Sequence, residues 1–131
     1  MSNPLVSCIV LNWNGETLLE ECLGSLLECG YSPLEVIVVD NASEDGSVDI
    51  VKKFHSVRLI RNERNLGYAA GNNVGFRHAT GKYVATLNND IVVSRSWLDT
   101  PVSYCESDTA IGSISCRQMN YFNRDTIDSL Y

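Results

Sequence analysis

Positive charge is scarce in this chain. Its 131 residues include 10 Lys and Arg against 16 Asp and Glu, which gives a formal net charge of −6. A nucleic-acid-binding protein normally carries a basic face that neutralises phosphates, so the composition argues against a nucleic-acid partner. A small anionic ligand stays compatible with it, because a local arginine, a metal ion or a helix N-terminus can reverse the sign of the potential in one cleft.

Paired cysteines and long apolar runs are also missing. The 5 cysteines are odd in number and include no C-x-x-C pair, which excludes the usual zinc spacings and disfavours a disulfide framework. We interpret Cys8 and Cys22 as buried small side chains in a reducing compartment. The start, Met-Ser-Asn-Pro, has no signal-peptide pattern, and no apolar run approaches a membrane span. We therefore expect a cytoplasmic protein, with peripheral attachment to a membrane left open for a longer form.

Two common nucleotide-binding motifs are absent. No G-x-G-x-x-G follows the first predicted strand, and no G-x-x-x-x-G-K-[ST] occurs anywhere, so the dinucleotide and P-loop interpretations fail. Gly67, Gly71 and Gly75 resemble a phosphate loop at first sight. Their spacing of four favours a smooth helix face that packs closely on a sheet, with direct ligand contact as the alternative.

The chain does contain an alternation of apolar runs and amphipathic segments. The apolar runs predict strands at residues 6–11, 34–39, 57–60, 83–87, 110–116 and 125–131. The amphipathic segments predict helices at residues 16–28, 43–54, 68–79 and 94–106. Asn14 is the expected N-cap of the first helix.

This order of strands and helices predicts a Rossmann-like α/β fold. Short connections between alternating strands and helices specify a mostly parallel sheet with right-handed crossovers and helices on both faces. The length suits one domain spanning residues 1–131. The first strand should lie between the second and the fourth and be among the most buried segments. The apolar run at 83–87 should be buried on both faces.

The end of the chain suggests a longer protein. The sequence stops on Leu130-Tyr131 inside a predicted strand, so we expect this chain to be the truncated N-terminal part of a larger one. Ile114, Tyr121, Leu130 and Tyr131 would then lack their cover. Because large exposed apolar patches usually mark interaction sites, we expect these residues to pack against a second copy, as a homo-oligomer.

Three of the predicted strands end on polar residues. They are followed by Asn12-Trp13-Asn14, Asp40-Asn41 and Asn88-Asn89-Asp90. Ligands of open parallel sheets bind beyond the carboxyl ends of the strands, at the point where the strand order reverses. Asparagine and aspartate oxygens are donors that Mg²⁺ or Mn²⁺ prefers. The polar ends therefore indicate a ligand site, although each cluster is also a common way to leave a strand.

Two of these residues have specific alternatives. Asp40 could accept a hydrogen bond from a base imide or a ribose hydroxyl, or it could simply cap a helix or a turn. Trp13 could stack on a base, or it could cover the core at the rim of the sheet.

Four motifs in order resemble glycosyltransferase family 2. They are residues 6–15 (VSCIVLNWNG), residues 38–47 (VVDNASEDGS), residues 64–75 (RNLGYAAGNNVG) and residues 87–90 (LNND). The resemblance covers nearly the whole chain. It implies the GT-A fold, a nucleotide-diphosphate sugar as donor (UDP-, dTDP- or GDP-linked) and a divalent metal, Mg²⁺ or Mn²⁺.

The resemblance also implies roles for single residues. Asp40 matches the carboxylate that contacts the nucleobase. Residues 88–90 match the metal-binding D-x-D-type motif, and Asn88 in place of the usual first Asp leaves Asp90 as the one charged metal ligand. The nucleotide-sugar-binding residues are expected to be Leu11, Asn12, Trp13, Asn14, Asp40, Asn65, Asn72 and Asn89. The catalytic base of the family is expected beyond residue 131.

The leading hypothesis is thus the donor-binding half of an inverting, metal-dependent glycosyltransferase. Its acceptor would be a glycan or a lipid-linked sugar, and the Asn-Asn-Asp form of the motif points to surface polysaccharide biosynthesis. A nucleotide-binding module without turnover is the first alternative. A sugar-nucleotidyltransferase is the second; it would need a Gly-rich loop bearing Arg or Lys after the first strand, which Asn14-Gly15-Glu16 does not supply.

Overall fold

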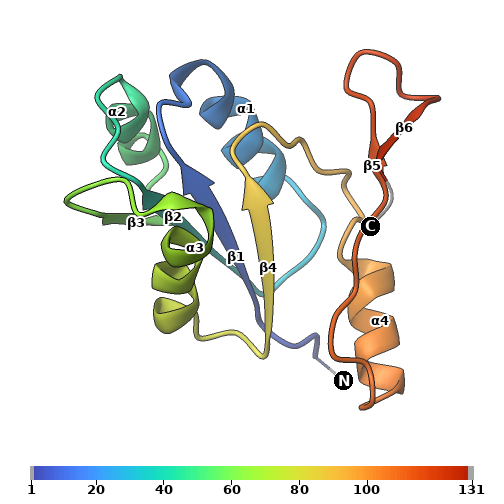
Figure 1. Ribbon diagram of the computed structural model, residues 1–131. Helices are drawn as coiled ribbons and strands as arrows, with labels where there is room; N and C mark the ends of the chain where they lie inside the picture. The colour runs from blue at the N-terminus through green and yellow to red at the C-terminus, as the bar shows by residue number, and fades with distance from the viewer. Residues whose placement is uncertain (1, 130–131) are drawn as a thin grey trace. The chain divides into compact units, whose positions relative to one another are not determined.

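The computed structural model describes residues 2–129. Its contacts divide them into two compact units, and the boundary in the sequence lies between Arg95 and Ser96. The first unit contains a four-stranded sheet and the second a helix and a two-stranded sheet (Figure 1). Whether the two units act as the single domain predicted from the length stays a prediction.

The four-stranded sheet of the first unit is parallel, with the strand order β3-β2-β1-β4. Its strands are β1 (Val6–Asn12), β2 (Leu34–Asp40), β3 (Val57–Arg61) and β4 (Tyr83–Asn88). The predicted position of β1 between β2 and β4 is confirmed, and residues 6–10 of β1 are at most 1% exposed. Three helices connect the strands: α1 (Glu16–Leu27), α2 (Ser47–Lys52) and α3 (Gly67–His78).

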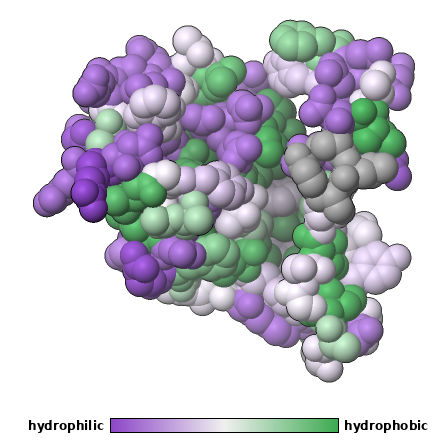
Figure 2. Space-filling view, viewed as in Figure 1, coloured by the Kyte–Doolittle hydropathy of each residue, from purple (hydrophilic) through white to green (hydrophobic). Residues whose placement is uncertain are grey.

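Both faces of the sheet are covered by apolar side chains. On one face Ile9, Ile37 and Val39 form a buried cluster with Val74 of α3, and Figure 1 shows α3 in front of β1 and β2. Because side chains alternate along a strand, the residues between these point to the other face, where α1 contributes a buried stripe. That stripe is Leu19, Cys22, Leu23 and Leu26. The outer surface of the short helix α2 is hydrophilic (Figure 2), as expected for a helix with one buried side.

The prediction that residues 83–87 are buried on both faces is wrong. Leu87 is buried, but Val84 and Thr86 are exposed. The physical reason is that, within the described residues, β4 is an edge strand of the sheet with β1 as its partner on one side. An apolar run alone does not distinguish an edge strand from a central one.

The second unit departs further from the predicted elements. Its helix α4 (Asp99–Ser107) begins later than predicted, which places Pro101 in the first turn, where proline is tolerated. Residues 110–116 form no strand, contrary to prediction; instead β5 (Gln118–Met119) pairs antiparallel with β6 (Ile127–Ser129). Ile114 and Tyr121 are exposed, as expected, at 41% and 48%. Leu130 and Tyr131 lie outside the described residues, and the pairing with a second copy stays a prediction.

Two of the three spaced glycines let α3 approach the sheet, as predicted. A Cβ added at Gly71 would lie 2.6 Å from Leu11 Cδ1, and one at Gly75 would lie 2.5 Å from Ile9 Cγ2. Gly67 does not belong to this face: nothing lies within 4 Å of an added Cβ, and its φ of +78° is the reason for a glycine. Gly71 and Gly75 therefore serve packing, whereas Gly67 serves a turn.

Polar contacts also fasten the amino ends of the strands, at the end of the sheet away from the polar clusters. Ser7 Oγ donates to Glu35, and the Gly81 N–H donates to Ser7 Oγ over 2.8 Å. The N–H and hydroxyl of Thr80 donate to the two Glu35 carboxylate oxygens, at 3.0 and 3.2 Å. Burial acts to raise the pKa of Glu35, but these hydrogen bonds outweigh it and lower the pKa below its ordinary value.

We predict opposite effects of alanine at two helical glycines. Gly75→Ala overpacks the contact with Ile9 and should lower the free energy of unfolding by about 1–3 kcal/mol. Gly24→Ala, inside α1 with nothing within 4 Å of the new Cβ, should raise it by about 0.5–1 kcal/mol. Urea unfolding of the two variants measures both values. Equal effects at the two sites would contradict the packing described for α3.

We also predict that Glu35 contributes a pH-dependent part of the stability. Because its pKa is lowered in the folded state, the contribution is present above the unfolded pKa of about 4.3 and is lost as the pH falls through the folded value. Glu35→Gln should therefore lose less stability than the wild type between about pH 6 and pH 3. Urea midpoints across this range test it, and parallel pH profiles would refute the assigned role.

Candidate functional site

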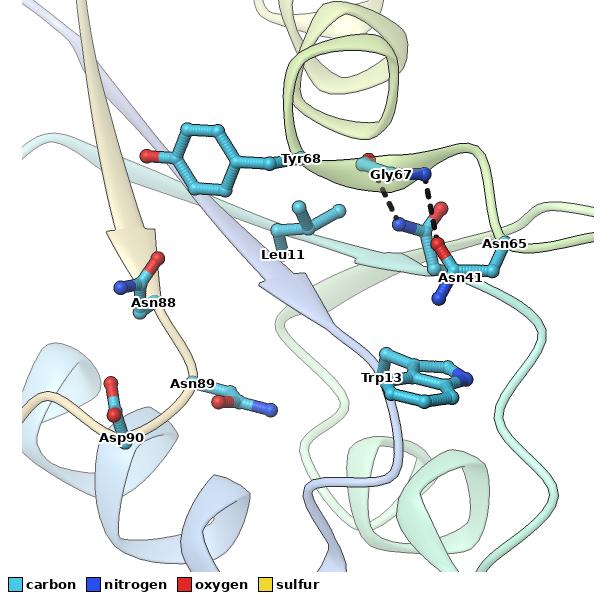
Figure 3. Close-up of a pocket in the computed structure, with 9 residues that line it drawn as sticks. All are labelled: Leu11, Trp13, Asn41, Asn65, Gly67, Tyr68, Asn88, Asn89 and Asp90. Carbon is cyan, nitrogen blue, oxygen red and sulfur yellow. Dashed lines mark hydrogen bonds between the residues drawn. The ribbon is translucent and has the colours of Figure 1, made fainter.

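A cavity of about 310 Å³ lies at the carboxyl ends of the strands in the first unit. Nine residues line it (Figure 3): Leu11, Trp13, Asn41, Asn65, Gly67, Tyr68, Asn88, Asn89 and Asp90. They come from the ends of β1, β2 and β4 and from the start of α3. Amides and aromatic rings dominate this lining, and Asp90 is its one charged residue.

Strand register explains why residues distant in sequence meet here. Asn12 of β1 pairs with Asp40 of β2, and Leu11 pairs with Asn88 of β4. The three strands therefore end at the same level, and their polar ends lie side by side at one rim, as the sequence predicted. The loop before α3 brings Asn65 to the same cavity, and the first turn of α3 brings Gly67 and Tyr68.

The structure separates the predicted site residues into two groups. Leu11, Trp13, Asn65, Asn89 and Asp90 line the cavity. Trp13 is 57% exposed, so its ring is available to a ligand. The other four, Asn12, Asn14, Asp40 and Asn72, do not line it.

Asp40 and Asn12 lie directly beneath the rim and are almost fully buried, at 1% and 0% exposure. Asp40 Oδ1 accepts hydrogen bonds from Asn12 Nδ2 at 3.0 Å and from the Ser43 hydroxyl at 2.6 Å. Asp40 Oδ2 accepts from the Ser43 N–H at 3.1 Å and lies 3.8 Å from the guanidinium of Arg61. Asp40 therefore makes the contacts of a residue that caps a turn, which was the second interpretation of this carboxylate from the sequence.

Asn14 holds the loop after β1. Its φ is +50°, its N–H donates to Ser43 Oγ at 2.9 Å, and its Oδ1 accepts from the Glu44 N–H at 2.9 Å. The prediction that it caps α1 is wrong, since the N-cap is Gly15. The left-handed backbone at Asn14, which asparagine tolerates, turns its side chain toward the neighbouring loop instead.

The amino ends of α1 and α2 cap each other. The Glu16 N–H donates to Asp45 at 2.9 Å, the Gly46 N–H donates to Glu16 at 3.1 Å, and the Gly15 N–H donates to Ser47 Oγ at 3.1 Å. Burial acts to raise the pKa of Asp45, but hydrogen bonds from Ser47 and Glu16 lower it overall. These contacts also explain why α2 begins at Ser47 and not at Ser43. The protein's own carboxylates occupy helix ends that could otherwise attract an anion.

Asn72 has a different environment on α3. Its Nδ2 donates to the Tyr68 carbonyl at 3.1 Å, and its Oδ1 is buried and accepts no hydrogen bond within the described residues. A buried acceptor without a donor is costly, so this oxygen suits a ligand donor or a water molecule.

Four lining residues had no ligand role assigned from the sequence, although Asn41 and Asn88 belong to the predicted polar strand ends: Asn41, Gly67, Tyr68 and Asn88. Asn41 Nδ2 donates to the Gly67 carbonyl at 3.2 Å, and the Gly67 N–H donates to Asn65 Oδ1 at 2.8 Å (Figure 3). The signal for Gly67 was the pattern Asn65-Leu66-Gly67, because an asparagine that bonds the backbone two residues on forms a turn and glycine is typical of turns. Tyr68 carried no signal of its own, because an aromatic in the first turn of a helix is more often part of the core.

Comparisons with known proteins agree with this arrangement. The model of the family described as "Glycosyl transferase family 2" matches residues 7–129. The chain belongs to glycosyl transferase family 2. An uncharacterized glycosyltransferase of Haemophilus influenzae is 34% identical over 117 residues, which are 84% of this chain and 36% of that protein. Glycosyltransferase GlyG of Streptococcus pneumoniae is 30% identical over 133 residues, 96% of this chain and 42% of GlyG. The chain thus spans less than half of each relative.

Solved structures extend the comparison to the fold. The mannosyltransferase PcManGT from Pyrobaculum calidifontis, in complex with GDP-Man and Mn²⁺, superposes with a TM-score of 0.81 at 33% identity, covering 88% of this chain and 36% of PcManGT. Residues 1–349 of S. aureus TarS, in complex with UDP-GlcNAc, give a TM-score of 0.73 at 26% identity, covering 82% of this chain and 32% of that fragment. The predicted GT-A fold is confirmed by these neighbours.

The residues at the rim also fit the divalent metal that this family implies. Asp90 offers a carboxylate, and Asn88 and Asn89 offer amide oxygens, the donors that hard cations take. No group of three His, Cys, Asp or Glu residues within residues 2–129 could hold a metal without further ligands. One carboxylate completed by the phosphates of a substrate is a usual arrangement for Mg²⁺.

No helix between residues 2 and 129 is long and apolar enough to cross a membrane.

Proposed function

We propose that this chain is the donor-binding part of an inverting, metal-dependent glycosyltransferase. It would bind a nucleotide-diphosphate sugar in the cavity at the strand ends, and the full-length protein would transfer the sugar to an acceptor hydroxyl. The observation that carries the proposal is the meeting of an exposed aromatic ring, several amides and one carboxylate, Asp90, in one cavity. The nucleotide sugars bound to PcManGT and TarS support it.

Each predicted residue has a proposed role, whether it lines the cavity or lies next to it. Trp13 would stack on the nucleobase, with Leu11 forming the apolar floor. Asn65 would bind hydroxyl or phosphate groups, Asn89 would offer its oxygen to a ligand hydroxyl or the metal, and Asn72 would offer its unpaired Oδ1 to a donor on the ligand. Asp40 would contact the base imide through Oδ2, which accepts fewer hydrogen bonds than Oδ1. Asn12 and Asn14 would shape the rim from below and from the side.

Asp90 is proposed to hold the divalent metal, Mg²⁺ or Mn²⁺, with help from neighbouring amide oxygens. When bound, the metal would neutralise the charge that develops on the diphosphate leaving group. Trp13 and Tyr68, both exposed at the cavity, would shield the donor from water. The general base that activates the acceptor is expected beyond residue 131, since nothing in the family motifs present here supplies it.

The acceptor and the compartment are part of the same proposal. A glycan or lipid-linked acceptor, used in polysaccharide biosynthesis, would bind mainly to the part of the protein beyond this chain. A cytoplasmic location is supported by the five free cysteines. Burial raises the pKa of both Cys8 and Cys22 to about 12, so these thiols stay protonated and inert.

The roles of Asp40 and Asp90 should be separable by mutation. Asp90→Asn removes the charged metal ligand and should cut the gain in nucleotide affinity that metal provides by at least about 10–100-fold, leaving the metal-free affinity nearly intact. Asp40→Ala removes a charge-assisted hydrogen bond to the nucleotide and should cost about 1.5–3 kcal/mol of binding measured without metal. Titrations of UDP, dTDP and GDP, with Mn²⁺ and with a chelator, measure both effects.

Two further variants serve as controls. Asp49→Asn changes an exposed carboxylate on α2 and should bind like the wild type. Asp40→Asn keeps the shape of the buried side chain and replaces the alanine variant if that one fails to fold. Wild-type protein that binds none of the three nucleotides would refute the proposed function. Equal losses in the Asp40 and Asp90 variants would refute the division of roles.

A further inference from the structure

Asn12 is the last residue of β1 and links Asp40 to Asn89, the residue that precedes Asp90. Its Nδ2 donates to Asp40 Oδ1 at 3.0 Å and to Ser43 Oγ at 3.2 Å, and its Oδ1 accepts from Asn89 Nδ2 at 2.8 Å. It is 0% exposed. Both of its N–H donors and one lone pair of its carbonyl oxygen are therefore used inside the protein, and its side chain exposes no atom to a ligand.

These bonds have a fixed direction that starts at Asp40. An ionised carboxylate only accepts hydrogen bonds, so Asn12 must turn its nitrogen toward Asp40 and its oxygen toward Asn89. Asn89 must then turn its own nitrogen toward Asn12. The oxygen of Asn89 is left to face the other way, in the lining of the cavity beside Asp90 (Figure 3). The charge of Asp40 thus sets the orientation of two amides in sequence.

We propose that Asn12 is a positioning residue that transmits the orientation set by Asp40 to Asn89, and so couples nucleotide binding to metal binding. This inference rests on the proposed function for its ligands. A correctly oriented Asn89 presents an acceptor oxygen next to Asp90, which suits a cation or a ligand hydroxyl. A reversed Asn89 would present N–H donors there and repel the cation.

The backbone at Gly15 encloses this arrangement. A Cβ at Gly15 would collide with both Asn89 Nδ2 and Asn12 Oδ1. The main chain therefore lies directly against the Asn12–Asn89 hydrogen bond and shields it from water on that side. Hydrogen bonds that water cannot reach are stronger and hold their geometry better than exposed ones.

The experiment compares two alanine variants within β1. Asn12→Ala removes the link, whereas Ser7→Ala removes another fully buried, hydrogen-bonded side chain at the opposite end of the same strand. Affinities for UDP and GDP are measured with Mn²⁺ and with a chelator, and the ratio gives the gain due to metal. Asn12→Ala should reduce this gain about tenfold, the usual scale for a residue that supports a metal ligand. Ser7→Ala should lower stability and leave the gain unchanged.

Three additional measurements separate positioning from simple destabilisation. The double variant Asn12→Ala/Asn89→Ala should lose no more of the gain than Asn89→Ala alone, because Asn12 acts only through Asn89. Gly15→Ala should reproduce the loss with Asn12 in place, and it replaces Asn12→Ala if that protein does not fold. In the ligand-free wild type, the side-chain amide protons of Asn89 should exchange slowly in NMR spectra, and this protection should vanish in Asn12→Ala.

The outcomes distinguish the inference from the proposed function. A wild type that binds nucleotide with a metal-dependent gain, together with an Asn12→Ala variant that keeps the full gain, would overturn the positioning role alone. Fast exchange of the Asn89 amide in the wild type would overturn it as well. A wild type that binds no nucleotide would overturn the proposed function, and with it the coupling.

Discussion

The register of β1 with its two neighbours is the constraint on which the site depends. Because Asn12 lies opposite Asp40 and Leu11 lies opposite Asn88, the strands end together and their polar residues meet. A shift of β1 by one residue would turn the opposite set of its side chains to each face. Asn12 would then leave its contacts with Asp40 and Asn89, and Ile9 would leave the cluster under α3. The same pairing therefore sets both the packing and the site.

The two ends of the sheet are polar for different reasons. At the amino ends, Glu35 gathers hydrogen bonds from Ser7 and Thr80, so the polar groups satisfy one another. At the carboxyl ends, the inner layer of Asn12, Asp40 and Ser43 is similarly satisfied. The outer layer of Trp13, Asn88 and Asp90 instead lines a cavity. Inner residues whose hydrogen bonds are satisfied support the residues that line the cavity. Such support holds the geometry of a binding site before a ligand binds.

Much of this arrangement could be predicted from the sequence. Apolar runs that stop on Asn or Asp predicted β1, β2 and β4 and the polar rim at their carboxyl ends, since both are local signals. The alternation of strands and helices predicted the position of β1 between β2 and β4. The motifs around Asn12, Asp40 and Asp90 were sufficient for the family. Sequence could not separate the buried Asn12 and Asp40 from the exposed Trp13, because burial at a strand end depends on neighbouring loops. Asn14 was mistaken for a helix cap since the alternative, a left-handed turn bonded to Ser43 and Glu44, is a long-range contact.

The most direct test of the central claim is to locate a bound metal within the sheet. Substoichiometric Mn²⁺ added with UDP or GDP broadens the NMR amide signals of nearby residues. If the metal binds at Asp90, the amide signals of Asn88, Asn89 and Asp90 should broaden strongly. Ser7 and Glu35 should broaden much less, because they lie at the far end of strands whose residues rise about 3.3 Å each. Broadening that is spread over the acidic surface, or centred away from the rim, would contradict metal binding at the carboxyl ends of the strands.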